Sequence, residues 1–300
     1  GEIHLVIVGW PCQGHSSAGT GSGLKDHRSH MFWEMLRVMR LVQEQQHISP
    51  AYILENVPLL GDTRSQLVAS MHQVRSWLGP VVFLDAASVG STAHRPRLWW
   101  TNLMPPEVLR RAYQHIVRPV GVTVDSILDA GRHSQLVRQD DRSPLAVVNR
   151  VGQPRAALPT LVSFPSSYAY RNGGPGLIWD AQHKELMEPT ADERERAMGF
   201  QTGTTAVPTV TEAARRHILG QAMDLNCLTW IVSLSLAEQR RLQSAMVPSL
   251  GCSFPTGTSE ERAGGDSTRD RHPWTSVEVR GEAVFNTLQS GRASGLSFLQ

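Results

Sequence analysis

The sequence predicts an α/β fold with a mostly parallel sheet, because short strand-like runs alternate with amphipathic helical patterns. The strand-like runs are short, apolar and bounded by turn residues, and they occupy 4–8, 51–54 and 81–84. Between these runs, apolar residues recur at helical spacing over 32–42 and 67–78. Such alternation is typical of parallel strands that are joined by right-handed crossovers.

The chain divides into four segments with different patterns. We expect an α/β lobe over 1–104, a loop-rich lobe over 105–176, a return to the first lobe over 177–240 and a disordered tail over 241–300. Between His94 and Arg155 there are ten arginines and no lysine, against five acidic residues. This excess of positive charge favours a polyanionic partner, but an arginine-rich solvated face explains it equally well.

The composition excludes several classes of protein. No apolar run approaches the ~18 residues of a membrane span, so no association with a membrane is expected. Cys12, Cys227 and Cys252 are too few and too unevenly spaced for a disulfide framework or a zinc cluster. We therefore expect no metal site, and we expect Cys12 to be a free thiol in a reducing compartment.

Three polar peptides lie next to the expected strands, at 9–19, 55–58 and 94–97. Active-site loops of open parallel sheets lie beyond the carboxyl ends of the strands. The thiol of Cys12, the carboxylate of Glu55 and the guanidinium of Arg97 should therefore meet at one edge. Each peptide alone has an ordinary interpretation, since a cysteine at a strand end is more often a small buried hydrophobe than a nucleophile.

Taken in order, the peptides resemble the motifs of the C5-cytosine DNA methyltransferases. Four motifs carry the resemblance in the first part of the chain. Residues 9–19 read Gly-x-Pro-Cys-Gln-x-x-Ser-x-Ala-Gly, and residues 26–32 read Asp-x-Arg-Ser-x-x-Phe. Residues 55–57 read Glu-Asn-Val, and residues 95–97 read Arg-x-Arg. Further along, the sequence at 190–200 is similar to the family's penultimate motif, and Gly-Gln-Ala-Met at 220–223 to its final one. Pro159-Thr160 is similar to the family's re-entry from its target-recognition region. The sequence at 93–102 resembles the eukaryotic de novo type more than the bacterial restriction enzymes.

The resemblance implies a partial Rossmann-like class I methyltransferase sheet with a small irregular target-recognition lobe. It also implies methyl transfer from S-adenosylmethionine to C5 of a DNA cytosine that is flipped out of the helix. Cys12 would attack C6, Glu55 would hydrogen-bond or protonate N3, and Arg97 would contact the ring carbonyl. The implied substrate-binding residues are Pro11, Gln13, Ser16, Asn56, Arg95 and Thr160, of which Asn56 would chiefly brace its loop. The implied cofactor-binding residues are Gly220, Gln221, Ala222 and Met223.

The sequence departs from the family pattern mainly in its cofactor site. The Phe-x-Gly-x-Gly loop and the acidic residue for the ribose are absent, so the first strands and most of the cofactor pocket are expected to be missing. The chain is then either an incomplete fragment or one whose missing half comes from another chain or segment. The glycines at 19–23 have no strand before them and are expected to form a mobile loop. His15 replaces the usual Phe, and Gln221 the usual Asn.

Other functions remain open. A catalytically inactive DNA-binding or regulatory protein would keep the arginine-rich lobe, and RNA could replace DNA as the substrate. Hydrolysis by Cys12 and His15 is the third alternative, but no carboxylate is evident to orient the histidine. If the chain is eukaryotic it is expected in the nucleus, and otherwise in the cytoplasm.

Overall fold

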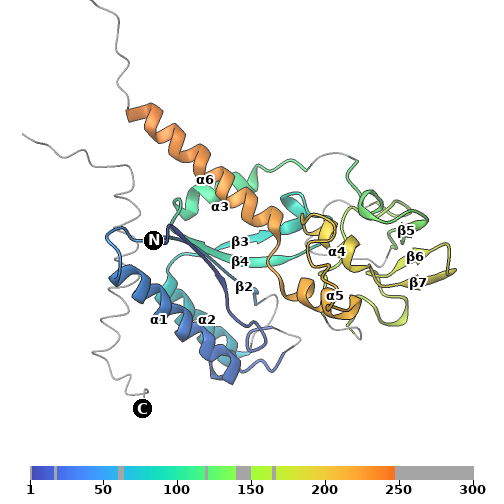
Figure 1. Cartoon of the computed structure of the whole chain (residues 1–300), viewed down its shortest axis with the longest axis horizontal. Coiled ribbons are helices and arrows are strands. Elements are labelled where there is room, and N and C mark those ends of the chain that lie inside the picture. Colours follow the sequence, from blue (N-terminus) through green and yellow to red (C-terminus); the bar gives the residue numbers. More distant parts are fainter. Residues whose placement is uncertain are drawn as a thin grey trace, which may run out of the picture.

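The structure, a computed structural model, describes residues 2–246 of the 300-residue chain except 17–18, 60–63, 119–120, 140–149 and 164–166. Its centre is a four-stranded sheet (Figure 1), with strands β1 (Leu5–Gly9), β2 (Ala51–Asn56), β3 (Val82–Asp85) and β4 (Pro96–Thr101). Their spatial order is β1-β2-β4-β3. The three strands expected from the sequence and the apolar run around Trp99 therefore belong to one sheet.

The direction of β4 corrects the expectation of a mostly parallel sheet. β1 and β2 are parallel, but β4 lies inside the sheet and runs antiparallel to both β2 and β3. Only residues 86–95 connect β3 to β4, and they contain one short 3-10 turn, Ala86–Ser88. A parallel neighbour needs a crossover of about a dozen residues or more, so this short connection returns the chain in the opposite direction.

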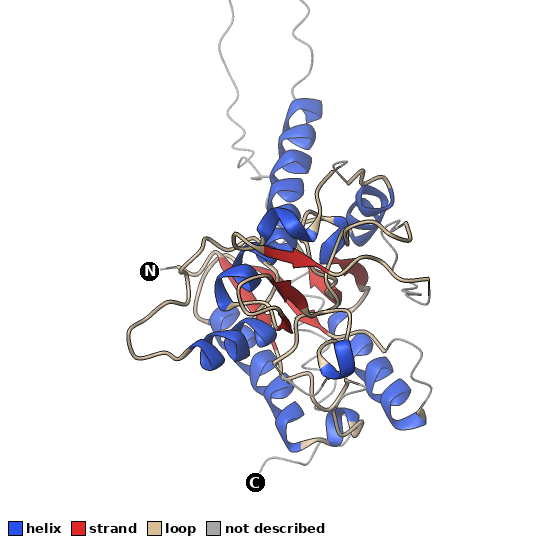
Figure 2. Cartoon of the chain, turned by 90° about the vertical axis from the view of Figure 1, so that its right-hand side faces the viewer, coloured by secondary structure: helices blue, strands red, loops and turns tan. Residues whose placement is uncertain are grey.

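Helices cover both faces of the sheet (Figure 2). Neighbouring residues of a strand point to opposite faces. Leu54 and Trp100 accordingly pack in the cluster that includes residues of α1 (His30–Glu44) and α2 (Ser65–Leu78). Ile53 and Trp99 pack in a second cluster with residues of α3 (Pro106–Gln114) and α6 (Leu225–Met246). Among the described strands β1 lies at one edge of the sheet, with exposed apolar side chains at Leu5 and Ile7.

A second lobe lies beyond one end of the central sheet, at the right of Figure 1. It contains a small antiparallel sheet made of β5 (Arg132–Ser134), β6 (Ile178–Asp180) and β7 (Glu185–Met187). β5 thus comes from the segment that was expected to be irregular, and it pairs with a strand beyond residue 176. An isolated bridge between Ala93 and Leu158 joins this lobe to the start of β4.

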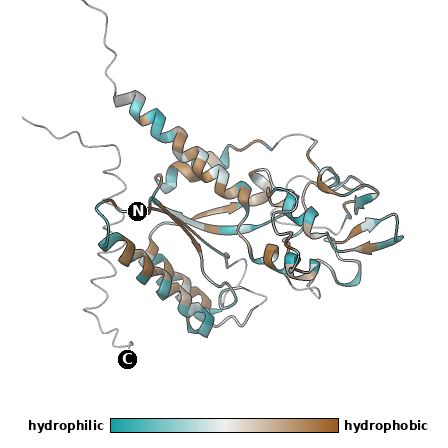
Figure 3. Ribbon diagram, viewed as in Figure 1, coloured by the Kyte–Doolittle hydropathy of each residue, from teal (hydrophilic) through white to brown (hydrophobic). Residues whose placement is uncertain are grey.

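The last part of the described chain is helical, as its periodicity predicts. α4 (Ala191–Ala197) begins at a capping box, in which the Thr190 side chain accepts from the Glu193 N–H and the Glu193 side chain accepts from the Thr190 N–H. α5 (Glu212–Gln221) follows, and α6 carries both hydrophobic and hydrophilic residues along its length (Figure 3). No helix in the described ranges is long and apolar enough to cross a membrane. The tail was predicted from residue 241, but α6 continues to Met246, and the rest of the predicted tail lies outside the described residues.

Candidate active site

An aromatic residue anchors the loop that carries Cys12. Trp10 follows β1 directly and is 4% exposed. Its ring centroid lies 5.2 Å from that of Phe32 on α1 and 5.5 Å from that of Trp100 on β4. Its carbonyl accepts a hydrogen bond from Asn56 Nδ2 at 3.2 Å. The loop is therefore held by α1, β2 and β4 together, which limits where Cys12 can lie.

Cys12 begins a tight turn, and its thiol is free and half-buried. Its carbonyl accepts hydrogen bonds from the backbone N–H groups of His15 and Ser16, both at 2.8 Å. Burial lowers the pKa of His15, although the charge of Asp26 opposes this shift. Within the described residues, neither ring nitrogen of His15 has a hydrogen-bond partner. No nucleophile–base pair therefore joins His15 to Cys12, which argues against the hydrolase alternative.

Two arginines lie close enough to Cys12 to respond to its charge. Hydrogen bonding to Asp26 raises the pKa of Arg28, and negative charge at Cys12 raises it further. Burial lowers the pKa of Arg95 to about 10, and negative charge at Cys12 opposes this shift. Both guanidinium groups therefore place positive charge near Cys12.

Glu55 and Arg97 form an ion pair at the end of the sheet from which the Cys12 loop emerges. Glu55 Oε1 lies 2.5 Å from Arg97 Nε, and both side chains are largely buried. Glu55 on β2 is in register with Trp99 on β4, so Arg97, two residues away along β4, shares its face of the sheet. The antiparallel direction of β4 places the start of this strand beside the end of β2. The predicted convergence of the three peptides thus depends on the strand whose direction the sequence did not reveal.

The Asn56 side chain points to the opposite face from Glu55, and it forms hydrogen bonds with backbone groups. Besides its bond to Trp10, its Oδ1 accepts a hydrogen bond from Val57 N at 2.7 Å. Both polar groups of the side chain are therefore engaged with the loops that follow β1 and β2. This is the bracing contact expected for Asn56.

Arg95 is a buried cation with spare hydrogen-bond donors. Its side chain is 4% exposed, and Nη2 donates to the Gly220 carbonyl at 3.2 Å. Its Nε and Nη1 are buried without a hydrogen-bond partner in the described part of the chain. A buried, unsatisfied donor is costly, so these groups are available to a ligand. The bond to Gly220 also joins the fourth strand to the motif that ends α5.

The final motif reaches the end of β1. A Cβ added to Gly9 would lie 3.0 Å from both Glu55 Oε2 and Met223 Cε, so these two side chains border the same glycine. Gln221 is exposed and ends α5, while Ala222 packs partly against the third core cluster. Of the four predicted cofactor-binding residues, Met223 therefore borders the same glycine as the catalytic candidate Glu55, and Gly220 is bonded to the substrate-binding candidate Arg95.

The remaining predicted substrate-binding residues are less closely tied to this centre. Pro11, Gln13 and Ser16 are half-buried in the Cys12 loop. The Gln13 side-chain carbonyl is buried and has no hydrogen-bond partner among the described residues. Thr160 is half-buried between Leu158 and Leu161, and within the described ranges no hydrogen bond connects it to Cys12, Glu55 or Arg97. The structure therefore brings Thr160 to this region only through its neighbour Leu158, whose carbonyl accepts from His94 N at 2.7 Å.

Comparison with known families identifies this part of the chain. A sequence model described as C-5 cytosine-specific DNA methylase matches residues 1–102, which contain the Cys12 loop, Glu55 and Arg97. The N-terminal segment is therefore similar to the C-5 cytosine-specific DNA methylases. The fold also matches the crystal structure of the S. pombe Dnmt2 methyltransferase, with 17% identity, a TM-score of 0.50 and coverage of 78% of each chain.

A second similar structure is the Entamoeba histolytica methyltransferase EhMeth. It shares 14% identity over 78% of this chain and 77% of its own, with a TM-score of 0.49. No curated protein sequence matches the chain significantly. At these identities the structural likeness concerns the fold alone, a mixed α/β fold with a partly parallel sheet.

Sequence analysis missed two buried carboxylates that lie next to predicted site residues. Asp85 ends β3, and its Oδ2 lies 2.7 Å from His94 Nδ1 while its Oδ1 accepts from Arg95 N at 2.8 Å. It therefore fixes the entry into β4. Asp85 was detectable as a polar residue at a strand end, but no local pattern indicates its partner.

The second carboxylate is Asp224, which directly follows the final motif. It accepts hydrogen bonds from Ser91 Oγ at 2.8 Å and from Cys227 N at 3.1 Å, and burial raises its pKa to about 6. Cys227 itself is fully buried in the core cluster on the α6 side of the sheet, and burial raises the pKa of its thiol. Of the two described cysteines, Cys12 is therefore the accessible one.

The residues predicted to hold S-adenosylmethionine fit only one side of such a ligand. The Gly220 carbonyl is engaged by Arg95, and Met223 borders Gly9. Asp224, the nearest acidic residue in sequence, is buried and bonded to protein groups, so it is not presented to a ribose. Gly220 and Met223 would therefore contact only one side of such a ligand, next to the end of β1.

Proposed function

We propose that this chain carries the catalytic centre of a C5-cytosine methyltransferase that acts on nucleic acid, with DNA as the first candidate. The observation that carries the proposal is that four groups lie together at one end of the strands of the sheet. These are the accessible thiol of Cys12, the ion pair of Glu55 with Arg97 and the unsatisfied donors of Arg95. A nucleophile, a carboxylate and hydrogen-bond donors to an anionic ring are the groups that this reaction requires.

The nucleophilic step belongs to Cys12. Its thiolate forms a bond to C6 of cytosine, and the electron pair of the C5–C6 double bond moves into the ring, toward N3 and O2. C5 then has enamine character and can take up an electrophile. When C5 later loses its proton, that electron pair restores the double bond and expels the Cys12 thiolate. Arg28 and Arg95, whose pKa values respond to charge at Cys12, supply nearby positive charge for the attacking anion.

Glu55 and Arg97 would act on the ring as negative charge develops. The Glu55 carboxyl group shares or transfers a proton at N3, and the Arg97 guanidinium donates to the ring carbonyl. In the free protein these two groups are bonded to each other at 2.5 Å. A bound cytosine must therefore replace part of this ion pair. Arg97 Nη1 also donates to the Pro96 carbonyl at 2.8 Å, a bond that does not involve Glu55. Because C6 is shielded in a stacked duplex, the base must leave the helix to reach these groups.

S-adenosylmethionine would supply the methyl group, with residues 220–223 as one wall of its site. The exposed edge of β1 supports completion of the site by a further strand from another segment or chain. Leu5 and Ile7 on this edge are 38% and 44% exposed, and an unpaired edge is a template for strand addition. This would place new loops beside Gly9 and Met223.

A regulatory or purely nucleic-acid-binding role is the second candidate. The one-sided cofactor wall favours it, since such a chain could bind nucleic acid without transferring a methyl group. The two candidates differ in one property that needs no cofactor. Only the enzyme forms a reversible bond between Cys12 and C6.

The test is release of tritium from C5 of cytosine in single-stranded and duplex DNA, and in RNA of the same sequence. Thiolate addition makes C5 basic, so it exchanges its hydrogen with water even without a methyl donor. We expect release by the wild-type chain and none by Cys12→Ser, because a hydroxyl is a far poorer nucleophile at neutral pH. Cys227→Ala should retain release. If Cys12→Ser still releases tritium, the mechanism is overturned. If the wild-type chain releases none, the regulatory role is favoured.

A trapping experiment tests the complete reaction. With fluorine at C5 the final proton loss cannot occur, so the covalent complex should accumulate in the presence of S-adenosylmethionine and survive denaturing electrophoresis. If tritium is released but no complex accumulates, the nucleophile is functional and the cofactor site is incomplete. If the complex forms in Cys12→Ser, another residue is the nucleophile.

A further inference from the structure

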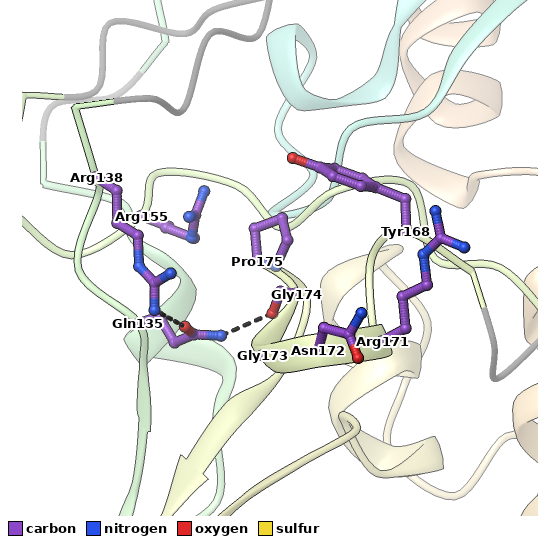
Figure 4. A pocket seen from close by; sticks show the side chains of 9 residues that line it. All are labelled: Gln135, Arg138, Arg155, Tyr168, Arg171, Asn172, Gly173, Gly174 and Pro175. Atoms are coloured by element: carbon purple, nitrogen blue, oxygen red, sulfur yellow. Dashed lines mark hydrogen bonds between the residues drawn. The ribbon is translucent and has the colours of Figure 1, made fainter.

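A cavity in the second lobe has the chemistry of a nucleotide site. Its volume is about 250 Å³, and it is lined by Arg138, Arg155, Arg171, Tyr168, Gln135 and the turn 172–175. Figure 4 shows Arg138 and Arg155 on one side of the cavity and Tyr168 and Arg171 on the other. We propose that this cavity binds one unpaired nucleotide of the nucleic-acid substrate, with its phosphate between the arginines and its base against Tyr168.

The charge of the cavity favours an anion. None of its nine lining residues is acidic. Within the described residues, neither Arg138 nor Arg171 forms an ion pair, and both are exposed. Arg155 is 5% exposed and forms the inner wall. Guanidinium groups bind phosphate oxygens through paired hydrogen bonds, so the two exposed guanidinium groups of Arg138 and Arg171 suit a phosphodiester.

Other arginines of this lobe form ion pairs or hydrogen bonds within the protein instead. Arg132 is largely buried and lies 3.3 Å from Glu193 and 3.8 Å from Asp180. Arg118 donates to the carbonyls of Ser91 and Ala156. The arginine-rich composition therefore separates into structural residues and a cationic cavity. This distinction is what the sequence did not show.

The aromatic side chain points to the second part of the ligand. Tyr168 is 70% exposed, although the neighbouring Tyr170 is buried beneath Arg194. An exposed aromatic ring beside arginines is the usual platform on which an unpaired base stacks. The cavity is smaller than the roughly 300–1,000 Å³ typical of drug-sized ligands. It therefore suits a single nucleotide better than a dinucleotide.

The cavity is held in shape before any ligand binds. Asn172 and Gly173 have φ values of 53° and 73°, and a Cβ on Gly174 would lie 2.5 Å from the Tyr168 carbonyl oxygen. The Gln135 Nε2 donates to the Gly174 and Leu177 carbonyls at 2.8 Å and 3.0 Å. Binding then requires little ordering of the backbone, which is favourable for affinity.

The position of the cavity connects it to the proposed active site. Arg155 lies three residues before Leu158, so their Cα atoms are at most about 10 Å apart. The Leu158 carbonyl accepts from His94 N, and Arg95 follows directly. A polynucleotide whose cytosine reaches Cys12 can therefore extend to this cavity. The inference rests on the proposed function for this reason, and it names a second contact with the same substrate.

The test uses the full chain and fluorescence anisotropy with a labelled single-stranded oligonucleotide and an abasic strand of equal length. Arg171→Ala should weaken binding of both strands and lower the slope of log affinity against log salt by about 0.7, the value for one phosphate contact. Tyr168→Ala should weaken binding of the base-containing strand at least about fivefold and leave the abasic strand unchanged. Tyr168→Phe should retain the affinity, because the ring remains.

Arg150→Ala is the matched control, since it removes the same charge from an exposed position of this lobe outside the cavity. An equal loss for Arg150→Ala and Arg171→Ala, or an unchanged affinity for Tyr168→Ala, would overturn the inference. The proposed function would survive that result if Cys12-dependent tritium release persists. Conversely, loss of binding in the cavity variants without any tritium release would support the cavity and overturn the enzyme.

Discussion

Glu55 on β2 and Arg97 on β4 are joined across two antiparallel strands by a contact of 2.5 Å between Oε1 and Nε. Each residue is the partner that makes burial of the other tolerable. The same two groups are the ones expected to contact the cytosine ring. Their contact therefore holds the site in shape before substrate binds and must be exchanged for contacts with the base.

Glu55→Gln should slow tritium release from C5 on the order of a hundredfold without abolishing it. The amide can still hydrogen-bond at N3 but transfers no proton, and general acid catalysis contributes at least about that factor. The measurement is the initial rate of release at saturating DNA. Glu34→Gln is the control, because it removes a carboxylate whose partner Arg37 lies on the outer face of α1. A wild-type rate for Glu55→Gln would exclude Glu55 from the reaction.

Asp224→Asn should become progressively more stable relative to the wild type as the pH rises from 4 to 7. Burial raises the pKa of Asp224 from 3.8 to about 6, so between these values the folded state binds a proton that the unfolded state has released. The contribution of this group to stability is therefore present at low pH and lost as the pH rises through 6. The expected change in the free energy of unfolding is roughly 3 kcal/mol, because each tenfold difference in proton affinity between the two states corresponds to about 1.4 kcal/mol.

Urea unfolding of both proteins across this pH range measures the effect. Other titrating groups cancel in the difference between the two free energies of unfolding. A difference that does not change with pH would show that Asp224 is ionised in the folded protein throughout the range.

Gly220→Ala should destabilise the protein by about 1–3 kcal/mol, the usual cost of overpacking. A Cβ at this position would lie 2.5 Å from the backbone nitrogen of Ser163, and backbone cannot move aside cheaply. The sign of the change in stability is informative, because alanine otherwise stabilises a helix relative to glycine by about 1 kcal/mol. Chemical denaturation gives the free energy, and Gln221→Ala at the exposed end of α5 should change it little. A stabilised Gly220→Ala would contradict the close approach of α5 to residues 162–163.

Local patterns in the sequence predicted most elements of the fold correctly. The runs at 4–8 and 51–54 are strands, and the periodic segments are α1, α2 and the helices after residue 190. The position of Cys12 after the first strand also followed from the sequence, because a strand ends where its apolar run ends. The resemblance to the methylases rests on the same local information, namely residue types at fixed spacing. The family match confirms it for residues 1–102 and does not reach the motifs at 190–200 and 220–223.

Only the tertiary structure decided which residues meet. β4 lies antiparallel inside the sheet, and this placement brings Arg97 to Glu55. Asp85 and Asp224 acquire their roles from partners that follow from this arrangement. The arginines of the second lobe divide into structural and cavity residues for the same reason. Periodicity records which face of an element is buried, whereas strand order, burial of charge and cavity shape depend on contacts between segments that no local window contains.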